Sequence, residues 1–402
     1  MLSKSISSFL RERGEEISAD IISWRRILHK IPELRMDTPK TEAEIIRVLK
    51  EIGIEDIRAG VGGHGVCAVI RGEIPGKCLG IRTDCDGLPI KEETGLEFAS
   101  TNGNMHACGH DAHTAMGLGA AKLIYEMRHV LKGTVKLIFQ PYEEGCGGAR
   151  LMINDGVLKS PDVEQIIGLH NHCEPDEDYL PGDILVTSEP ITANVYSYVA
   201  TFRGDTCHVC HSGAAANAVY MACEAVFRIS KISEGNTQSV NAVTVVNGGV
   251  RNNIVPKTCT IEGSIRSFDR DEHTRMKEDV HRILEEAARA HGGEVTVTPS
   301  NDVMETRIDK GVYDNFCAVA NEIFTERGCV QVKERELIGE DFAYYADMIP
   351  GLYFRLHDKP EGEYYPLHHS KFTVDESVLY KGSVMLAGYA LMWQNERAAQ
   401  SG

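Results

Sequence analysis

The chain has 402 residues, with hydrophobic and charged contents of 42% and 25%, so it is too long for one compact core and its composition is that of a soluble globular protein. The formal net charge of −17 argues against nucleic acid as a partner, because such a site needs a basic surface. No basic, then apolar leader opens the chain, and no apolar run is long enough to cross a membrane. We therefore expect a cytoplasmic protein of two domains whose 12 cysteines are thiols.

Apolar periodicity in the first part of the chain predicts alternating helices and strands. The helices are expected at 3–31, where Pro32 stops the pattern, at 41–52, at 111–127 and from about 149. The strands are expected at 65–70, 78–83, 134–140 and 165–169. This alternation indicates an α/β layer with a mostly parallel sheet and flanking helices.

The pattern changes after about Pro190. Strands are expected at 195–202, 239–247 and 258–267, and helices at 215–230 and 271–291. This order indicates a ferredoxin-like β-α-β-β-α-β unit with an antiparallel sheet, inserted into the first domain. The α/β pattern resumes at about Val303 and ends in a helix. The expected division is a first domain over 1–190 and 304–402 and an inserted domain over 191–303.

The segment Met105–Thr114 concentrates groups that bind metal ions. Cys108 and His110 flank Gly109, so both side chains turn toward one point if the backbone bends at the glycine. Thiolate and imidazole suit zinc and its borderline neighbours, and the predicted helix N-terminus here also favours a thiolate. The alternative is a polar loop with one buried cysteine, and it is weakened because further ligand candidates follow strands elsewhere.

Those further candidates are Asp84, the pair Glu143–Glu144 and His170, each at the C-terminal end of a predicted strand. In open α/β sheets this edge is where sites are built. Neighbouring residues of an extended chain face opposite sides, which predicts that Glu144 faces metal ions while Glu143 faces a water molecule. A solvated acidic loop and a histidine satisfied at a strand end are the alternatives.

Three aspartates, Asp84, Asp86 and Asp111, are candidates for a supporting role. Such a carboxylate holds a metal-binding imidazole by its other nitrogen. Asp84 and Asp86 are otherwise turn residues, and Asp111 otherwise caps the helix that begins there. His106, His113 and His172 are left out of the expected ligand set.

Motifs spread over nearly the whole chain occur in the order of one known family. They are Trp24–Leu34, Arg82–Pro89, Met105–Thr114, Phe139–Gly145, Gly168–His170, Asn253–Pro256, Gly263–Arg266, Glu340–Phe342 and His368–Ser370. On these residues the sequence resembles the M20 metallopeptidase-like amidohydrolases, in particular the branch of N-acyl-amino-acid, hippurate and auxin-conjugate hydrolases. The resemblance implies a catalytic domain with two metal ions and an inserted lid domain that often makes a homodimer.

The resemblance also implies roles for particular residues. The metal ligands fall on Cys108, which would bridge the ions, and on His110, Glu144, His170 and His368. The last is chosen over His369 by its distance from Phe372. Glu143 falls on the catalytic carboxylate and His208 on the lid histidine, and Asn253 and Arg266 fall on substrate contacts. The two divalent ions per subunit would be zinc, manganese, cobalt or nickel.

The expected reaction is hydrolysis of the amide bond of N-acyl amino acids or similar carboxylate-bearing amides. Two divalent ions lower the pKa of a shared water, and Glu143 takes its proton and returns it to the leaving nitrogen. Arg266 is a candidate clamp for a substrate carboxylate, with a surface salt bridge as the alternative. Other candidate functions are a dipeptidase, an aminobenzoyl-glutamate-type hydrolase and a non-catalytic binding relative.

The lid segment Gly204–Ser212 departs from the family pattern. His208 is kept, and we expect it to donate a hydrogen bond to the developing oxyanion. Cys207, Cys210 and His211 are additions that line the substrate pocket or form a third metal site, and we favour the first. The run Cys207–His211 also matches a haem attachment pattern, which normally needs export.

Overall fold

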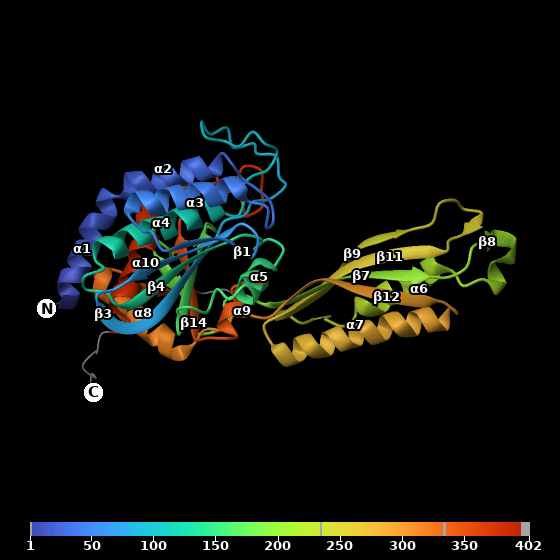
Figure 1. Cartoon of the computed structure of the whole chain (residues 1–402). Helices are drawn as coiled ribbons and strands as arrows, with labels where there is room; N and C mark the ends of the chain where they lie inside the picture. The colour runs from blue at the N-terminus through green and yellow to red at the C-terminus, as the bar shows by residue number, and fades with distance from the viewer. Residues whose placement is uncertain (1, 234, 333–334, 395–402) are drawn as a thin grey trace. The chain divides into compact units, whose positions relative to one another are not determined.

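The computed structural model describes residues 2–233, 235–332 and 335–394, and these form two compact units (Figure 1). The first unit contains the described residues of 2–189, 307–332 and 341–394, and the second contains those of 190–306 and 335–340. The segment 335–340, which the sequence analysis left in the first domain, therefore groups with the second unit. The carbonyl oxygens of Leu337 and Ile338 accept hydrogen bonds there from Arg266 Nη1 at 2.7 Å and from the Ala193 amide at 2.8 Å.

An eight-stranded sheet organises the first unit, in the order β1-β2-β4-β3-β5-β14-β6-β13. The strands are β1 (Ile57–Val61), β2 (Gly65–Arg71), β3 (Ile74–Asp84), β4 (Lys132–Gln140), β5 (Gln165–His172), β6 (Ile184–Val186), β13 (Cys329–Gln331) and β14 (Gly351–His357). Parallel pairing joins β3 to β4 and β5, β5 to β14, and β6 to β13. The remaining three pairs are antiparallel. The predicted α/β layer with a mostly parallel sheet is confirmed.

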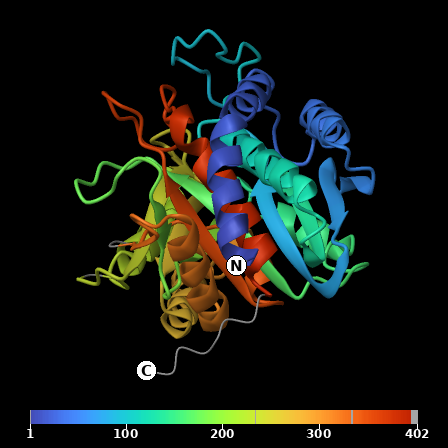
Figure 2. The same ribbon diagram turned by 90° about the vertical axis from the view of Figure 1, so that its left-hand side faces the viewer.

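Helices surround this sheet. They are α1 (Leu2–Glu16), α2 (Ser18–His29), α3 (Pro39–Ile52), α4 (His110–Glu126), α5 (Gly148–Asn154), α8 (Lys310–Ile323), α9 (Ala343–Ala346) and α10 (Leu379–Met392). The single helix predicted at 3–31 was wrong, because Ile17 (φ −87°, ψ 3°) separates α1 from α2. The break lets α1 pack mainly on α10 and α2 mainly on α4, and the N-terminal helices lie beside the red α10 in Figure 2. None of the helices in the described residues has the length and apolar character needed to cross a membrane.

The central helix α4 carries the metal-binding motif into the core. Of its 17 residues, 14 are buried, and it packs against α2, α3, α10 and β3. Two glycines permit this close packing: a Cβ on Gly119 would lie 2.3 Å from Ser383 Oγ, and one on Gly117 would lie 3.0 Å from Thr83. Gly109 precedes the helix at φ 84°, a conformation that favours glycine. The bend places His110 at the C-terminal edge of the sheet.

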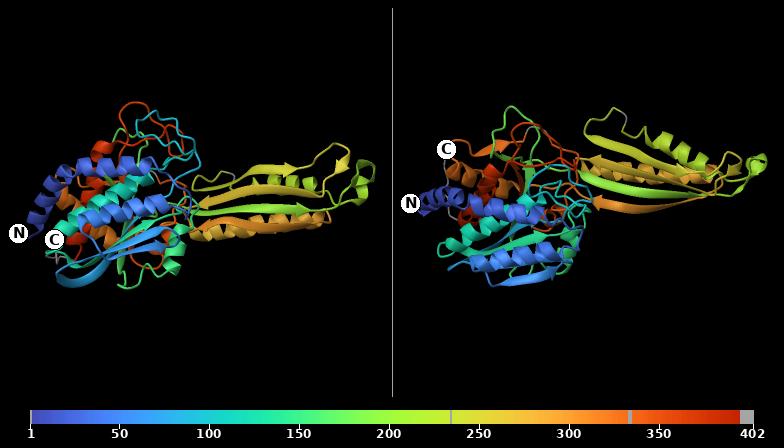
Figure 3. Two further views of the ribbon diagram at one scale, coloured as in Figure 1. Left: turned by 45° about the horizontal axis from the view of Figure 1, so that its top comes forward. Right: turned by 90° about the horizontal axis from the view of Figure 1, so that it is seen from above.

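The second unit has the predicted ferredoxin-like order. It runs through β7 (Asn194–Arg203), α6 (Ala218–Ile229), β9 (Ser239–Gly248), β11 (Thr258–Ser267), α7 (Arg270–Ala290) and β12 (Glu294–Val303). The sheet order is β12-β7-β11-β9, with every pair antiparallel. Both helices pack on β7 and β11 and on each other, and Figure 3 shows α7 running along the long strands. A separate ribbon pairs β8 (Cys207–His208) with β10 (Ile254–Val255).

Candidate metal centre

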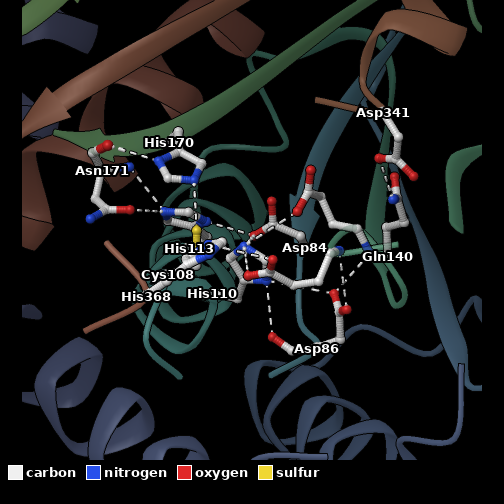
Figure 4. Close-up of polar contacts among 12 residues, drawn as sticks. Asp84, Asp86, Cys108, His110, His113, Gln140, His170, Asn171, Asp341 and His368 are labelled. Atoms are coloured by element: carbon white, nitrogen blue, oxygen red, sulfur yellow. Dashed lines mark hydrogen bonds and ion pairs between the residues drawn. The ribbon is translucent and has the colours of Figure 1, made fainter. Parts of the chain in front are cut away.

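The predicted ligands of the first unit converge at the C-terminal edge of its sheet (Figure 4). Among the described residues, two of the five groups of potential ligands contain Cys108: Cys108, His110 and His170 form one triplet, and Cys108, Glu144 and His368 form the other. Within each triplet the potential ligand atoms lie within 4.8 Å of one another. Cys108 Sγ is common to both triplets, and it lies 3.5 Å from His170 Nε2. Cys108 therefore lies where these two groups of potential ligands meet.

Backbone contacts set the tautomers of two of these histidines. His110 Nδ1 lies 2.9 Å from the carbonyl oxygen of Asp86, and His170 Nδ1 lies 2.8 Å from that of Asn171. A carbonyl can only accept, so Nδ1 carries a proton in both rings, which leaves Nε2 as the ring nitrogen that could bind a metal ion. His110 Nε2 is buried and has no hydrogen-bond partner. A buried imidazole nitrogen without a partner, held by its other nitrogen, is what a metal ligand requires.

Glu143 and Glu144 both face the centre, contrary to the expectation that they point to opposite sides. Glu143 Oε2 and Glu144 Oε1 lie 3.8 and 3.9 Å from His110 Nε2. The expectation assumed an extended chain, whereas these residues lie in a turn. Asp86 holds that turn, because its carboxylate accepts hydrogen bonds from the amides of Glu143 at 2.9 Å and Glu144 at 3.3 Å.

The charge balance of the cluster favours a cation. Burial lowers the pKa of His110, but the charge of Asp84 and the hydrogen bond to Asp86 outweigh it and raise that pKa to about 10. Burial, opposed by His110 and reinforced by the charges of Asp86 and Asp84, raises the pKa of Glu144 to about 7. Asp84, Glu143 and Glu144 place three carboxylates within 4.0 Å of His110 Nε2. Divalent ions would balance this concentration of negative charge.

Asp84 is a buried carboxylate next to the centre. Its Oδ1 lies 2.6 Å from His113 Nδ1 and 4.0 Å from His110 Nε2, and its Oδ2 accepts from Arg82 at 2.8 Å. Burial opposes ionisation of Asp84, but His110, His113 and Arg82 together hold its pKa well below the usual range. The closest histidine to Asp84 is therefore His113, which is outside the predicted ligand set, and not the predicted ligand His110.

Asp111 does not hold a ligand imidazole, and its Oδ1, buried without a hydrogen-bond partner, does not cap α4. Its Oδ2 instead binds Arg25 Nε at 2.7 Å and His29 Nδ1 at 2.8 Å. Burial opposes its ionisation, but the charges of Arg25 and His29 lower the pKa of Asp111. The contact anchors the start of α4 to α2. Sequence reasoning missed Arg25 and His29, although both lie in the motif Trp24–Leu34.

A second buried network ties the glutamate turn to the rest of the sheet edge. Asp341 accepts hydrogen bonds from Arg82 Nη2 at 2.9 Å, Gln140 Nε2 at 2.7 Å and the Ala149 amide at 2.9 Å. Gln140 and Ala149 flank the turn that carries Glu143, so the network fixes both of its ends. Sequence reasoning gave Arg82 no role, yet an arginine inside an apolar strand was itself a signal, since buried arginines are nearly always paired.

His368, and not His369, contributes to the ligand triplets. His368 Nε2 lies 3.5 Å from Glu144 Oε2, and its amide donates to the carbonyl oxygen of Ala107 at 2.8 Å. Its backbone has φ 65°, which is uncommon for a residue with a side chain and is a form of strain found at functional sites. His369 instead stacks on Tyr365, with ring centroids 4.8 Å apart.

The second unit carries the remaining predicted residues in two separate places. His208 on β8 and Asn253 are neighbours, since the Val209 amide donates to the carbonyl oxygen of Asn253 at 3.0 Å. β11 begins at Thr258, shortly after the ribbon that contains His208, and Thr258 pairs with Arg203. Arg266 lies near the opposite end of β11, where it pairs with Val195. Those eight residues of strand span about 26 Å. His208 and Arg266 of one chain therefore do not reach the same small molecule within this unit.

Comparison with known proteins agrees with this architecture. Residues 80–392 match the model of Peptidase family M20/M25/M40. The chain is 33% identical over 398 residues to thermostable carboxypeptidase 1 of Saccharolobus solfataricus, covering 96% of this chain and 98% of that protein. It is 34% identical over 379 residues to N-acetylcysteine deacetylase of Bacillus subtilis, covering 92% and 96%.

Among solved structures, a Bacillus subtilis protein described as a dinuclear metal binding peptidase from the M20 family matches with a TM-score of 0.77. The two chains are 33% identical, and the match covers 94% of this chain and 98% of that one. Fold and relatives together define a hydrolase that acts on amide or peptide bonds. The chain belongs to peptidase family M20/M25/M40, which confirms the predicted resemblance.

Proposed function

We propose that the chain hydrolyses the amide bond of N-acyl amino acids, or of similar amides that carry a carboxylate, with two divalent metal ions per subunit. The observation that carries the proposal is the pair of ligand triplets that share Cys108. The similarity to a deacetylase of N-acetylcysteine supports the substrate class, and the similarity to a dinuclear metal binding peptidase supports the number of ions. The thiolate and imidazole ligands favour zinc, and the family resemblance also implies manganese, cobalt or nickel as alternatives.

The residues present fit such ions. Cys108, His110 and His170 would hold one ion, and Cys108, Glu144 and His368 would hold the other. Two bound divalent ions polarise a carbonyl group and lower the pKa of a water molecule. His110 Nε2 and Glu144 Oε1 are buried without hydrogen-bond partners, which fits ligand atoms facing a cation.

Glu143 is the carboxylate that belongs to neither triplet containing Cys108. Its side chain is only 7% exposed and faces the same centre as the ligands. In the proposed mechanism Glu143 accepts a proton from the water that attacks the amide carbonyl carbon. The protonated Glu143 then donates this proton to the amide nitrogen as the carbon–nitrogen bond breaks, and it returns to its starting state.

Arg266 is the proposed clamp for the substrate carboxylate. Its Nη1 binds the carbonyl oxygen of Leu337 at 2.7 Å, which orients the guanidinium. A guanidinium presents five N–H groups in a fixed plane, so one orienting bond leaves enough donors for a paired interaction with a carboxylate. Asn253 would add a further polar contact to the substrate from the segment next to His208.

The separation of His208 and Asn253 from Arg266 supports a homodimer formed through the second unit. If all three residues contact one substrate, His208 and Asn253 must come from a second copy of the chain. The surface suits such an assembly, because β9 is an edge strand with exposed Val245 and Val246. Tyr220 and Phe227 on α6 are also 61% and 69% exposed. An edge strand beside exposed apolar side chains favours a self-complementary interface.

Amine release from a panel of amides by the metal-reconstituted enzyme tests the proposal. The panel contains N-acetyl and N-benzoyl amino acids, dipeptides and aminobenzoyl-glutamate, with carboxyl esters of the best substrates as matched controls. We expect N-acyl amino acids to be cleaved fastest and their esters to lose most of kcat/KM. Faster cleavage of dipeptides would favour the dipeptidase alternative, and no cleavage with any metal would favour a binding protein.

A further inference from the structure

The segment that begins at His208 contains a local contact that the proposed function does not use. His208 precedes the 3₁₀ turn Val209–Ala214, and its side chain accepts a hydrogen bond from the amide of Cys210. The Cys210 nitrogen lies 3.3 Å from His208 Nδ1, and the Cys210 thiol sulfur lies 3.0 Å from the same atom. The backbone N–H and the thiol group of Cys210 therefore both face His208 Nδ1.

These two contacts determine where the imidazole proton lies. A backbone amide can only donate, so His208 Nδ1 must carry a lone pair. A neutral imidazole then has its proton on Nε2. Because Nδ1 has no hydrogen to give, the short contact with sulfur requires that the thiol donates its S–H hydrogen. The ring is thus held as the tautomer in which Nε2 is a hydrogen-bond donor.

We propose that Cys210 is a positioning residue that keeps His208 as an Nε2–H donor and fixes the direction of its ring. The proposal deepens the proposed function, since it rests on His208 donating to the oxyanion of the amide being cleaved. Both side chains are exposed, so without the thiol only the longer amide contact would oppose rotation of the ring and competition by water. Because His208 is exposed, surrounding side chains do not bury its ring, and a contact with a residue close in sequence is needed to orient it.

The neighbouring thiol of Cys207 offers a matched control. Cys207 and His208 are successive residues of β8, so their side chains point to opposite faces of the ribbon. A third metal site is the competing interpretation of the cysteines and His211. Within residues 2–233, 235–332 and 335–394, no group of three or more potential metal ligands contains Cys207, His208, Cys210 or His211, which disfavours a third metal site.

The experiment is long-range proton–nitrogen correlation spectroscopy of the full-length, zinc-loaded enzyme labelled with ¹⁵N-histidine. Signals of His208 are assigned by comparison with His208→Gln. We expect His208 to show a protonated Nε2 and an unprotonated, hydrogen-bonded Nδ1. Cys210→Ala should shift the Nδ1 resonance and lower kcat about 3- to 10-fold with KM unchanged, as for the loss of one hydrogen bond. Cys210→Ser, which restores a donor, should recover both, and Cys207→Ala should leave the Nδ1 resonance unchanged.

Two results would overturn the proposal: a proton on His208 Nδ1 in the parent enzyme, or the same Nδ1 resonance in Cys210→Ala and Cys207→Ala. The spectrum is independent of turnover, so failure of the proposed function is recognised separately. If His208→Ala kept the parent kcat while Cys210→Ala still shifted Nδ1, the catalytic part of the proposal would be overturned together with the role of His208.

Discussion

The metal centre of the first unit and the His208 segment of the second unit are held in place by different means. The ligands around Cys108 lie at the start of α4, in the turn after β4, on β5 and in the loop that contains His368. Three of the five are buried, and the Asp86 carboxylate holds the turn that carries Glu144. His208 lies on a two-residue strand, is exposed, and is oriented by the residue two positions later. Ligands that share ions need a rigid, charge-balanced frame, whereas a single hydrogen-bond donor needs only a defined tautomer and direction.

The largest effect is expected at Glu143, the proposed proton carrier of the buried centre. Glu143→Gln removes the basic oxygen while preserving shape, so kcat should fall about 100- to 10,000-fold. Metal content should stay at the parent value, because Glu143 is in neither triplet that contains Cys108. Steady-state kinetics together with metal analysis is the measurement. A variant within tenfold of the parent kcat would remove Glu143 from the mechanism.

Cys108→Ser tests whether one thiolate serves both halves of the centre. A serine hydroxyl is a poor anionic ligand at neutral pH, so both ions should bind more weakly and activity should be lost when metal is not in excess. Elemental analysis after dialysis measures this, with Cys146→Ser as a control because Cys146 is in no ligand triplet. Two tightly held equivalents in Cys108→Ser would show that Cys108 is not the bridge.

A smaller effect is expected at His208, because the second unit contributes one hydrogen bond rather than a ligand. His208→Ala should lower kcat about 100-fold, the usual consequence of losing an oxyanion donor. Metal content should be unchanged. A parallel loss of metal would mean that His208 belongs to the centre, and the contrast between the two regions would disappear.

A still smaller effect than that of His208→Ala is expected at Arg266. Arg266→Lys keeps the charge but loses the planar, paired donors, so kcat/KM for N-acyl amino acids should fall about 10-fold. The same variant should cleave the corresponding carboxyl esters as the parent does. An equal loss on acids and esters would indicate a structural role, for example through the contact with Leu337.

The alternation of strands and helices, and the strand ends that carry Asp84, Glu144 and His170, followed from apolar periodicity and were predictable. What the sequence did not reveal depends on turns and tertiary packing. Glu143 and Glu144 share one side because the chain turns there, and no periodic signal marks that turn. Asp111 binds Arg25 because α2 crosses the start of α4, and the break at Ile17 follows from two helices packing on different neighbours.

The position of residues 335–340 also depends on tertiary contacts that the sequence does not reveal. Their assignment to the second unit fits the hydrogen bonds that their carbonyl oxygens accept from the Arg266 side chain and the Ala193 amide, and such contacts leave no local pattern in the sequence. Similarly, the contact between Cys210 and His208 could not be inferred from a Cys-x-x-Cys-His spacing, which is equally compatible with a metal cage or a pocket wall. The sequence motifs identified the candidate site residues, whereas the atomic contacts between them could be identified only from the structure.

Anomalous diffraction from crystals of the zinc-loaded enzyme, recorded across the zinc absorption edge, tests the central claim most directly. The account predicts two anomalous peaks per subunit, each at a zinc–sulfur distance of about 2.3 Å from Cys108 Sγ. One peak should also be ligated by His110 and His170, and the other by Glu144 and His368. A single peak, or a second ion that does not touch Cys108, would contradict it.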